Sequence, residues 1–482
     1  MDLSKLTIVE ARRALDAQEY SALELTNAYL DAIAEKDGEI HAYLEVWADS
    51  AREEARAADA MMAVGKSQPL TGIPLAIKDN ILIEGRIASA ASKMLENYTA
   101  SYDATVISKL KAQGTVFLGR TNMDEFALGS STENSAYGPT KNPHDTSRVP
   151  GGTSGGSAAA VAAGMAIAAL GSDTGGSIRQ PAAFCGIVGL KPTYGAVSRS
   201  GLIAAASSLD QIGTLAKNVG DANALFSAIR GHDPMDSTSL PESSEQATVN
   251  RNRKIVGVPR EFLKDLAPEM RTQFENTLQT LKGKGYSVVD VALPSLQYAL
   301  AVYYIINPAE VSTNLARLDG IRYGLSVPAD TIGEVYSKTR AGGFGPETRR
   351  RILVGTFVLS SGYADAYYRK ARSVRELIRA DFAKAFESVD AIVMPTTPSP
   401  AFKLGEKNSD PVSLYLEDIF TVPVNLAGVP AISVPGGTVE RPSTSLGAGG
   451  TVKLPVGFQI IGTWGGEDTL FAIGHEVENS RV

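Results

Sequence analysis

Two glycine-flanked clusters of hydroxyl residues stand close together within residues 151–181, which read GGTSGGSAAAVAAGMAIAALGSDTGGSIRQP. In the second cluster, Ser177 follows Gly175 and Gly176, which carry no side chains. A carbonyl carbon can therefore approach the Ser177 hydroxyl, and several backbone N–H groups can converge on one oxygen. Such a convergence is what an oxyanion hole requires, so the pattern predicts a reactive serine in a tight turn.

The segment between the two clusters is rich in alanine. Residues 157–170 carry small or apolar side chains on every helical face and no charge. This composition predicts a helix that is buried on all sides. Such a helix would separate the clusters, so they could form one site only if the chain folds back.

Strand-like and helix-like segments alternate along the 482 residues. We expect strands at 73–81, 116–119, 255–258, 286–292, 391–394, 431–434 and 456–461, and helices at about 218–230, 267–284 and 360–388. Alternation of this kind predicts an α/β fold around one large, mostly buried sheet. We expect a single domain over 1–482, with helices in 1–65 packed on it, and surface loops at 232–253 and 437–452.

Composition narrows the classes of function. The net charge is -7, and a protein that is the main contact to nucleic acid usually carries a basic patch. A basic partner chain is not excluded by this. The single cysteine, Cys185, lies among apolar residues, which predicts a buried structural thiol in a reducing compartment. No secretory signal or membrane-spanning run is found, so the expected location is the cytoplasm.

A serine nucleophile needs a base, and the four histidines all lie in polar or helical settings. Lys78 is the better candidate, since it ends an apolar strand in GIPLAIKDN. Burial disfavours the ammonium form and lowers the pKa, which makes a neutral amine available. The alternative is a strand-end lysine whose ammonium reaches water. No spacing of cysteine or histidine indicates a metal site.

A second serine competes for the role of nucleophile. Residues 152–156 match G-x-S-x-G, the nucleophile elbow of α/β-hydrolases, with Ser154 at its centre. The elbow requires a preceding strand, whereas 142–148 reads as a loop. The context therefore disfavours Ser154 as the attacking group.

GIPLAIKDN, GGTSGGSAAAVAAG and GSDTGGSIRQPAAFCGIVGLKPTYG together resemble the amidase signature family. That family has an α/β/α sandwich and a Ser–cisSer–Lys triad. The resemblance implies that Ser177 is the nucleophile, that Lys78 is the base, and that backbone groups of Thr174, Gly175 and Gly176 form the oxyanion hole. The relay position of the triad is occupied here by Thr153, which keeps a hydroxyl. Ser154 is the neighbouring hydroxyl and is expected to point elsewhere.

Segments 121–145, 314–324, 349–368 and 418–437 resemble one branch of this family, whose members hydrolyse free glutamine. The resemblance implies that Arg351 binds the α-carboxylate, Asp418 binds the α-amino group, and Tyr303 or Tyr304 lines the pocket. A zwitterion requires one fixed cation and one fixed anion, and the arginine fork fits a carboxylate. The alternative for Arg351, within Arg349–Arg351, is a solvated helix face.

The same resemblance implies partners. Members of this branch pass ammonia to a B subunit, which uses ATP and magnesium to amidate the amino acid on misacylated tRNA, and a small C subunit joins both. This chain itself is expected to need no cofactor. Two other functions stay open: a stand-alone amidase that acts on a small amide, and an assembly subunit without activity. Whether aspartyl-tRNA is also a substrate is not decided by the sequence.

Overall fold

A computed structural model describes residues 2–241, 253–443 and 450–479. Its strands form one mixed sheet in the order β1-β3-β2-β4-β6-β5-β10-β11-β9-β7-β8. In chain order the strands are β1 (Tyr43–Val46), β2 (Pro74–Lys78), β3 (Val116–Thr121), β4 (Ala168–Asp173), β5 (Val188–Lys191), β6 (Gln211–Ala216), β7 (Ile255–Val258), β8 (Ser287–Asp290), β9 (Ala391–Pro395), β10 (Ala431–Pro442) and β11 (Thr451–Gly462).

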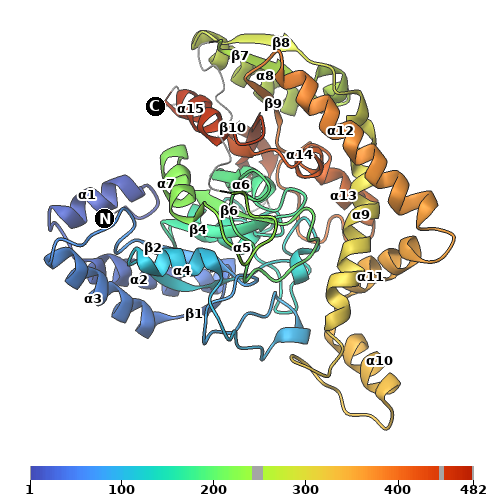
Figure 1. Cartoon of the computed structure of the whole chain (residues 1–482). Coiled ribbons are helices and arrows are strands. Elements are labelled where there is room, and N and C mark those ends of the chain that lie inside the picture. The colour runs from blue at the N-terminus through green and yellow to red at the C-terminus, as the bar shows by residue number, and fades with distance from the viewer. Residues whose placement is uncertain (1, 242–252, 444–449, 480–482) are drawn as a thin grey trace.

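Helices lie on both sides of this sheet (Figure 1), which gives the α/β/α arrangement that the family resemblance implies. The longer ones are α1 (Ile8–Asp16), α2 (Ala22–Ile40), α3 (Ala48–Ala63), α4 (Thr105–Ala112), α5 (Gly155–Ala162), α6 (Arg179–Cys185), α7 (Val219–Ile229), α8 (Pro268–Gly283), α9 (Ala299–Asn314), α10 (Ile332–Gly343), α11 (Pro346–Leu359), α12 (Lys370–Phe386), α13 (Pro411–Tyr415), α14 (Val422–Ala427) and α15 (Glu467–Glu478). The 3₁₀ helices are η1 (Lys93–Leu95), η2 (Glu125–Ala127), η3 (Arg260–Leu263), η4 (Pro294–Tyr298), η5 (Leu315–Arg317) and η7 (Leu416–Asp418), and η6 (Asp365–Arg369) is a π-helix.

The prediction of one long helix over 157–170 is wrong. Helix α5 ends at Ala162, Gly164 adopts a left-handed conformation with φ of 71°, and strand β4 begins at Ala168. Because part of the apolar run is a fully buried strand, periodicity alone does not distinguish it from a buried helix. The change of direction at Gly164 is the fold-back that brings the two hydroxyl clusters together.

Other predictions are confirmed in outline. All seven expected strands have a counterpart in the sheet. The sequence patterns did not predict strands β1, β4, β5 and β6. Part of the segment 437–452, expected as a loop, instead forms the end of β10 and the start of β11. Of the two expected loops, residues 242–252 and 444–449 lie outside the described residues.

Strands β2 and β4 position the site. They pair in parallel, with Ile77 beside Leu170, so Lys78 and Asp173 end the two strands at the same edge of the sheet. Both strands are flanked by others and buried along their whole length. The carboxyl ends of neighbouring parallel strands are where α/β folds bind ligands.

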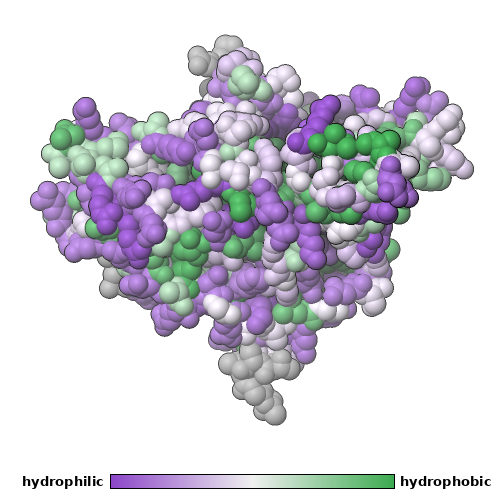
Figure 2. All heavy atoms as spheres, turned by 90° about the horizontal axis from the view of Figure 1, so that it is seen from below, coloured by the Kyte–Doolittle hydropathy of each residue, from purple (hydrophilic) through white to green (hydrophobic). Residues whose placement is uncertain are grey.

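The surface is mostly hydrophilic, with several apolar patches on the face seen from below (Figure 2). One exposed apolar row follows α11 and η6 and includes Leu353, which is 70% exposed, Phe357 and Tyr367. Rows of this kind mark surfaces that another molecule covers. Within the described ranges, no helix combines the length and apolar character needed to cross a membrane.

Candidate active site

Lys78 lies at the end of β2 with its side chain fully buried. Its Nζ donates to Thr153 Oγ1 at 2.7 Å, to Ser154 Oγ at 2.8 Å and to Ser172 Oγ at 3.0 Å. Burial lowers the pKa of Lys78 to about 7, although the charges of Asp124 and other nearby carboxylates act in the opposite direction. The neutral amine is therefore well populated near pH 7, as a general base requires.

Thr153 and Ser154 differ in what their hydroxyl protons do. Ser154 Oγ donates to the Ser172 carbonyl at 3.1 Å, so its single proton is engaged. Thr153 Oγ1 accepts from Lys78 Nζ, and among the described residues it donates its own proton to no acceptor. The Gly152–Thr153 peptide is cis. The expectation that Ser154 points elsewhere is wrong, because both hydroxyls contact Lys78, yet only Thr153 has a proton free to pass to it.

Ser177 lies in the turn between β4 and α6 and is 7% exposed. Its carbonyl accepts from the Ser154 N–H at 3.0 Å, which joins the two hydroxyl clusters directly. Within the described part of the chain, no group hydrogen-bonds to the Ser177 hydroxyl. We refer to Lys78, Thr153, Ser154, Ser172 and Ser177 as the catalytic cluster.

The backbone around Ser177 presents unpaired donors. The Gly176 N–H donates to Asp173 Oδ1 at 2.8 Å, so this group of the expected oxyanion hole is occupied. The N–H groups of Thr174, Gly175 and Ser177 have no partner among the described residues. Since buried backbone donors are almost always paired, three such groups in one turn indicate a place for an oxygen of a ligand.

Glycine is required at both positions before Ser177. A Cβ at Gly175 would lie 2.7 Å from the phenol oxygen of Tyr303, and one at Gly176, where φ is 137°, would lie 2.3 Å from Thr421 Oγ1. Thr421 Oγ1 in turn donates to the Gly175 carbonyl at 2.6 Å. Residues far along the chain therefore hold the turn that carries Ser177.

A second cluster surrounds Arg351 on α11. Arg351 is 4% exposed, so the alternative of a solvated helix face is wrong. Its Nε donates to Glu347 Oε1 at 2.7 Å, and its guanidinium lies over the rings of Tyr304 and Tyr415, 4.6 and 4.9 Å from their centroids. We refer to Arg351, Glu347, Tyr304, Tyr415 and Asp418 as the head-group cluster.

Asp418 supplies the negative charge of this cluster. Its Oδ2 accepts from Ser130 Oγ at 2.7 Å and from Tyr304 Oη at 3.2 Å. Burial raises the pKa of Asp418 to about 7, and the hydrogen bond from Ser130 and the charge of Arg351 partly offset this rise. One cation and one anion thus both contact Tyr304, which gives the pair of charges that a zwitterion requires.

The two clusters adjoin each other. Tyr303 and Tyr304 are consecutive on α9, and their rings meet edge to face with centroids 5.1 Å apart. Tyr303 packs against Gly175 in the turn that carries Ser177, whereas Tyr304 contacts Arg351 and Asp418. All the residues expected at the site are therefore brought into one continuous region.

Sequence reasoning missed several members of this region. Ser172 accepts from both Lys78 and Asn80, and its place as a hydroxyl within GSDTGG was a usable signal. Glu347 stands four residues before Arg351, a spacing that pairs charges on a helix. Asp124 accepts backbone N–H bonds from the loop that carries Ser130 and so fixes that loop. No sequence pattern indicated this last role.

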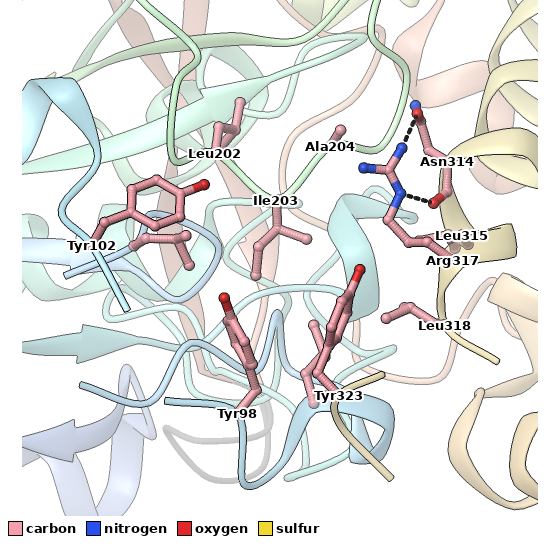
Figure 3. Close-up of a pocket in the computed structure, with 12 residues that line it drawn as sticks. Tyr98, Tyr102, Leu202, Ile203, Ala204, Asn314, Leu315, Arg317, Leu318 and Tyr323 are labelled. Carbon is pink, nitrogen blue, oxygen red and sulfur yellow. Dashed lines mark hydrogen bonds between the residues drawn. The ribbon is translucent and has the colours of Figure 1, made fainter. Parts of the chain in front are cut away.

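A separate cavity of about 170 Å³ lies beside the site and is lined by aliphatic and tyrosine side chains, including Tyr98 and Tyr323, together with Asn314 and Arg317 (Figure 3). Ile203 lines it and donates its N–H to the Asn80 carbonyl at 2.9 Å. None of the catalytic cluster lines this cavity. In the described ranges, no group of three or more histidine, cysteine, aspartate or glutamate side chains is placed to hold a metal ion.

Comparison with known proteins finds relatives along nearly the whole chain. The Amidase family model matches residues 24–471. The A subunit of the glutamyl-tRNA(Gln) amidotransferase of Roseiflexus castenholzii is 52% identical over 98% of this chain and 95% of that protein.

Two solved structures extend the comparison. The crystal structure of the A subunit of glutamyl-tRNA(Gln) amidotransferase from Thermotoga maritima has a TM-score of 0.79 and 42% identity, and covers 99% of this chain and 95% of that one. The peptide amidase of Stenotrophomonas maltophilia has a TM-score of 0.79 and 30% identity, with 99% and 97% covered.

Proposed function

Since this chain belongs to the amidase family, we propose that it is the glutamine-hydrolysing subunit of a tRNA-dependent amidotransferase. The observation that carries the proposal is the pairing of a buried lysine–hydroxyl base with a buried Arg351–Asp418 pair in adjoining clusters. The first provides acyl-transfer chemistry, and the second fits the charged head group of a free amino acid. Full-length relatives named as the A subunit of such an enzyme support it.

In the proposed mechanism, Ser177 attacks the side-chain amide carbon of glutamine. Its proton passes to Thr153, whose own proton moves to the neutral Lys78 amine 2.7 Å away. The oxyanion accepts hydrogen bonds from the unpaired N–H groups of Thr174, Gly175 and Ser177, and one such donor contributes about 3 to 4 kcal/mol in other enzymes. The protonated lysine then returns the proton to the leaving ammonia.

Water completes the cycle. It hydrolyses the γ-glutamyl ester on Ser177, with Lys78 again as the base, and releases glutamate. Arg351 and Asp418 hold the α-carboxylate and the α-amino group during both steps, so the reacting carbon stays at the nucleophile turn. The work of this chain thus ends with free ammonia.

The partners follow from the same proposal. A B subunit binds ATP and magnesium and amidates the amino acid on misacylated tRNA with this ammonia, and a C subunit joins the two. The exposed apolar row on α11 and η6 supports assembly with other chains. We place this assembly in the cytoplasm and treat residues 1–482 as a single catalytic unit.

Two alternatives make different demands on the structure. A stand-alone amidase for small amides has no use for a buried Arg351–Asp418 pair. An inactive assembly subunit has no use for a lysine whose pKa is lowered to about 7 between hydroxyl groups. Both features favour the glutaminase.

The test is co-expression with candidate B and C subunits, followed by measurement of glutamate release from glutamine with and without charged tRNA and ATP. Release of glutamate by the assembled complex is the expected result. Hydrolysis of simple amides with no preference for glutamine would support the stand-alone amidase, and absence of any hydrolysis would support the assembly subunit.

A further inference from the structure

Asn307 on α9 has a buried donor without a partner. The residue is fully buried, and its Oδ1 accepts from Arg351 Nη1 at 3.0 Å. Its Nδ2 hydrogen-bonds to no described residue. The orientation of the amide is fixed, because arginine only donates and therefore must face the oxygen of Asn307. A buried amide N–H₂ without an acceptor is unfavourable unless a ligand supplies one.

The position of Asn307 places it beside the head-group cluster. It follows Tyr303 by four residues and Tyr304 by three, so the three side chains share one face of α9. This helix and α11 lie side by side (Figure 1), and the Asn307–Arg351 hydrogen bond joins them. The unpaired amide is therefore adjacent to the guanidinium that binds an anion in the proposed function.

Arg351 also has donors to spare. Its Nε donates to Glu347, its Nη1 donates to Asn307, and the rings of Tyr304 and Tyr415, which stack on each other, lie 4.6 and 4.9 Å from its guanidinium carbon. The Nη2 group has no partner among the described residues. A planar anion that meets this edge of the guanidinium would accept from Nη2 and has room for one more donor on its second oxygen.

We propose that Asn307 Nδ2 supplies that donor, so that Arg351 and Asn307 together bind the α-carboxylate of the amino acid substrate. The proposal rests on the proposed function and adds a specificity-determining residue to it. Asn307 thus acts through both ends of its amide. Its oxygen orients Arg351 by accepting a hydrogen bond, and its nitrogen donates a hydrogen bond to the substrate carboxylate. A substrate without the carboxylate leaves Nδ2 unpaired and is discriminated against.

The experiment compares two substrates in the assembled complex: L-glutamine and 4-aminobutanamide, which is glutamine without its α-carboxylate. Asn307→Leu and Asn307→Asp are the variants, since the second keeps the acceptor for Arg351 and removes the donor. Loss of a hydrogen bond to a charged group corresponds to a fall of about 10- to 100-fold in the ratio of kcat/KM for glutamine to kcat/KM for 4-aminobutanamide. The KM for glutamine rises while kcat changes little.

Ser312→Ala is the matched control on α9, because this hydroxyl only donates to its own helix at the Ala309 carbonyl. It should leave the substrate ratio unchanged. Ammonia-driven amidation of tRNA by each variant complex verifies the fold independently of glutamine.

The outcomes separate the two proposals. If the parent complex does not hydrolyse glutamine, the proposed function fails. If the parent hydrolyses glutamine and the Asn307 variants keep the parental substrate ratio, whether through full activity or through equal losses on both substrates, the role of Asn307 is overturned and the residue is structural.

Discussion

The catalytic cluster and the head-group cluster each contain a buried cation, yet the pKa values of the two cations are shifted in opposite directions. Lys78 is surrounded by hydroxyls and a carbonyl, and its pKa falls to about 7. Arg351 is also opposed by burial, but Tyr304 and Glu347 hold its pKa well above the ordinary value. A general base must be able to lose its charge, whereas a residue that binds an anion must keep it. The carboxylate of Glu347 contacts Arg351, while no carboxylate hydrogen-bonds to Lys78 among the described residues, and this difference separates the two roles.

The largest effect tests the catalytic cluster alone. We expect Ser177→Ala to reduce glutamine hydrolysis by on the order of 10⁴-fold or more, because the covalent route is lost. The fold should be retained, since only a hydroxyl is removed. Glutamate release and ammonia-driven amidation are measured together.

A glutamine-analogue electrophile should label Ser177 in the parent protein. Labelling of Ser154 instead would overturn the assignment of the nucleophile and restore the elbow interpretation.

The next prediction concerns the hydroxyl that contacts Lys78. Thr153→Val keeps the shape and removes the proton relay, so turnover should fall by roughly 10²-fold or more, the usual scale for a positioned proton-transfer group. Thr153→Ser keeps the hydroxyl and should retain or raise turnover. Single-turnover hydrolysis of glutamine measures both.

Ser154→Ala provides the contrast. The substitution removes the oxygen that accepts from Lys78 Nζ and from the Ser172 N–H. It does not remove a proton that could pass to Lys78, so we expect turnover to fall by only about tenfold. Near-normal turnover in Thr153→Val together with an inactive Ser154→Ala would show that the proton passes through Ser154.

The head-group cluster should affect binding more than chemistry. Arg351→Ala removes the partner of the α-carboxylate, and losing one member of a desolvated charge pair costs about 2 to 5 kcal/mol. We expect KM for glutamine to rise more than tenfold while ammonia-driven amidation is retained. Normal kinetics with glutamine would instead favour the stand-alone amidase.

The pH dependence should resolve the two clusters in one experiment. Lys78 is neutral above its pKa of about 7, so kcat should rise with pH through that region. Asp418 is ionised above its pKa of about 7, so KM for glutamine should fall over the same range. Steady-state kinetics from pH 6 to 9 measure both changes, because this range extends from about one unit below to about two units above the two pKa values.

Variants assign each limb to one cluster. Asp418→Asn should abolish the pH dependence of KM and leave the pH dependence of kcat unchanged. Lys78→Ala should remove the rise of kcat with pH. If Asp418→Asn removes the kcat limb instead, the separation of chemistry from binding is wrong.

The smallest effect is expected at Glu347, which holds Arg351 Nε without facing the substrate. Glu347→Gln keeps an acceptor oxygen and removes the charge, so KM should rise by a few-fold, in keeping with a neutral hydrogen bond in place of a charged one. A change confined to kcat would contradict a positioning role through Arg351.

Much of the catalytic cluster was predictable because its cause is local. Glycines before Ser177, an apolar strand before Lys78 and two hydroxyl clusters 18 or more residues apart in sequence are all visible in the chain. The alanine-rich segment between them was predicted wrongly, since a buried strand and a buried helix have similar composition. The family resemblance then supplied roles for Arg351 and Asp418 that their neighbours in sequence did not indicate.

The sequence by itself determined the α/β scaffold and predicted the kind of chemistry, a serine nucleophile with a lysine base. Only the tertiary structure decided which hydroxyl has a proton free for Lys78, and that Arg351 is buried beside the unpaired amide of Asn307. The physical reason is that the direction of a hydrogen bond and the burial of a charge depend on partners distant in the chain. Thr153 lies 75 residues from Lys78, and Arg351 lies 44 residues from Asn307.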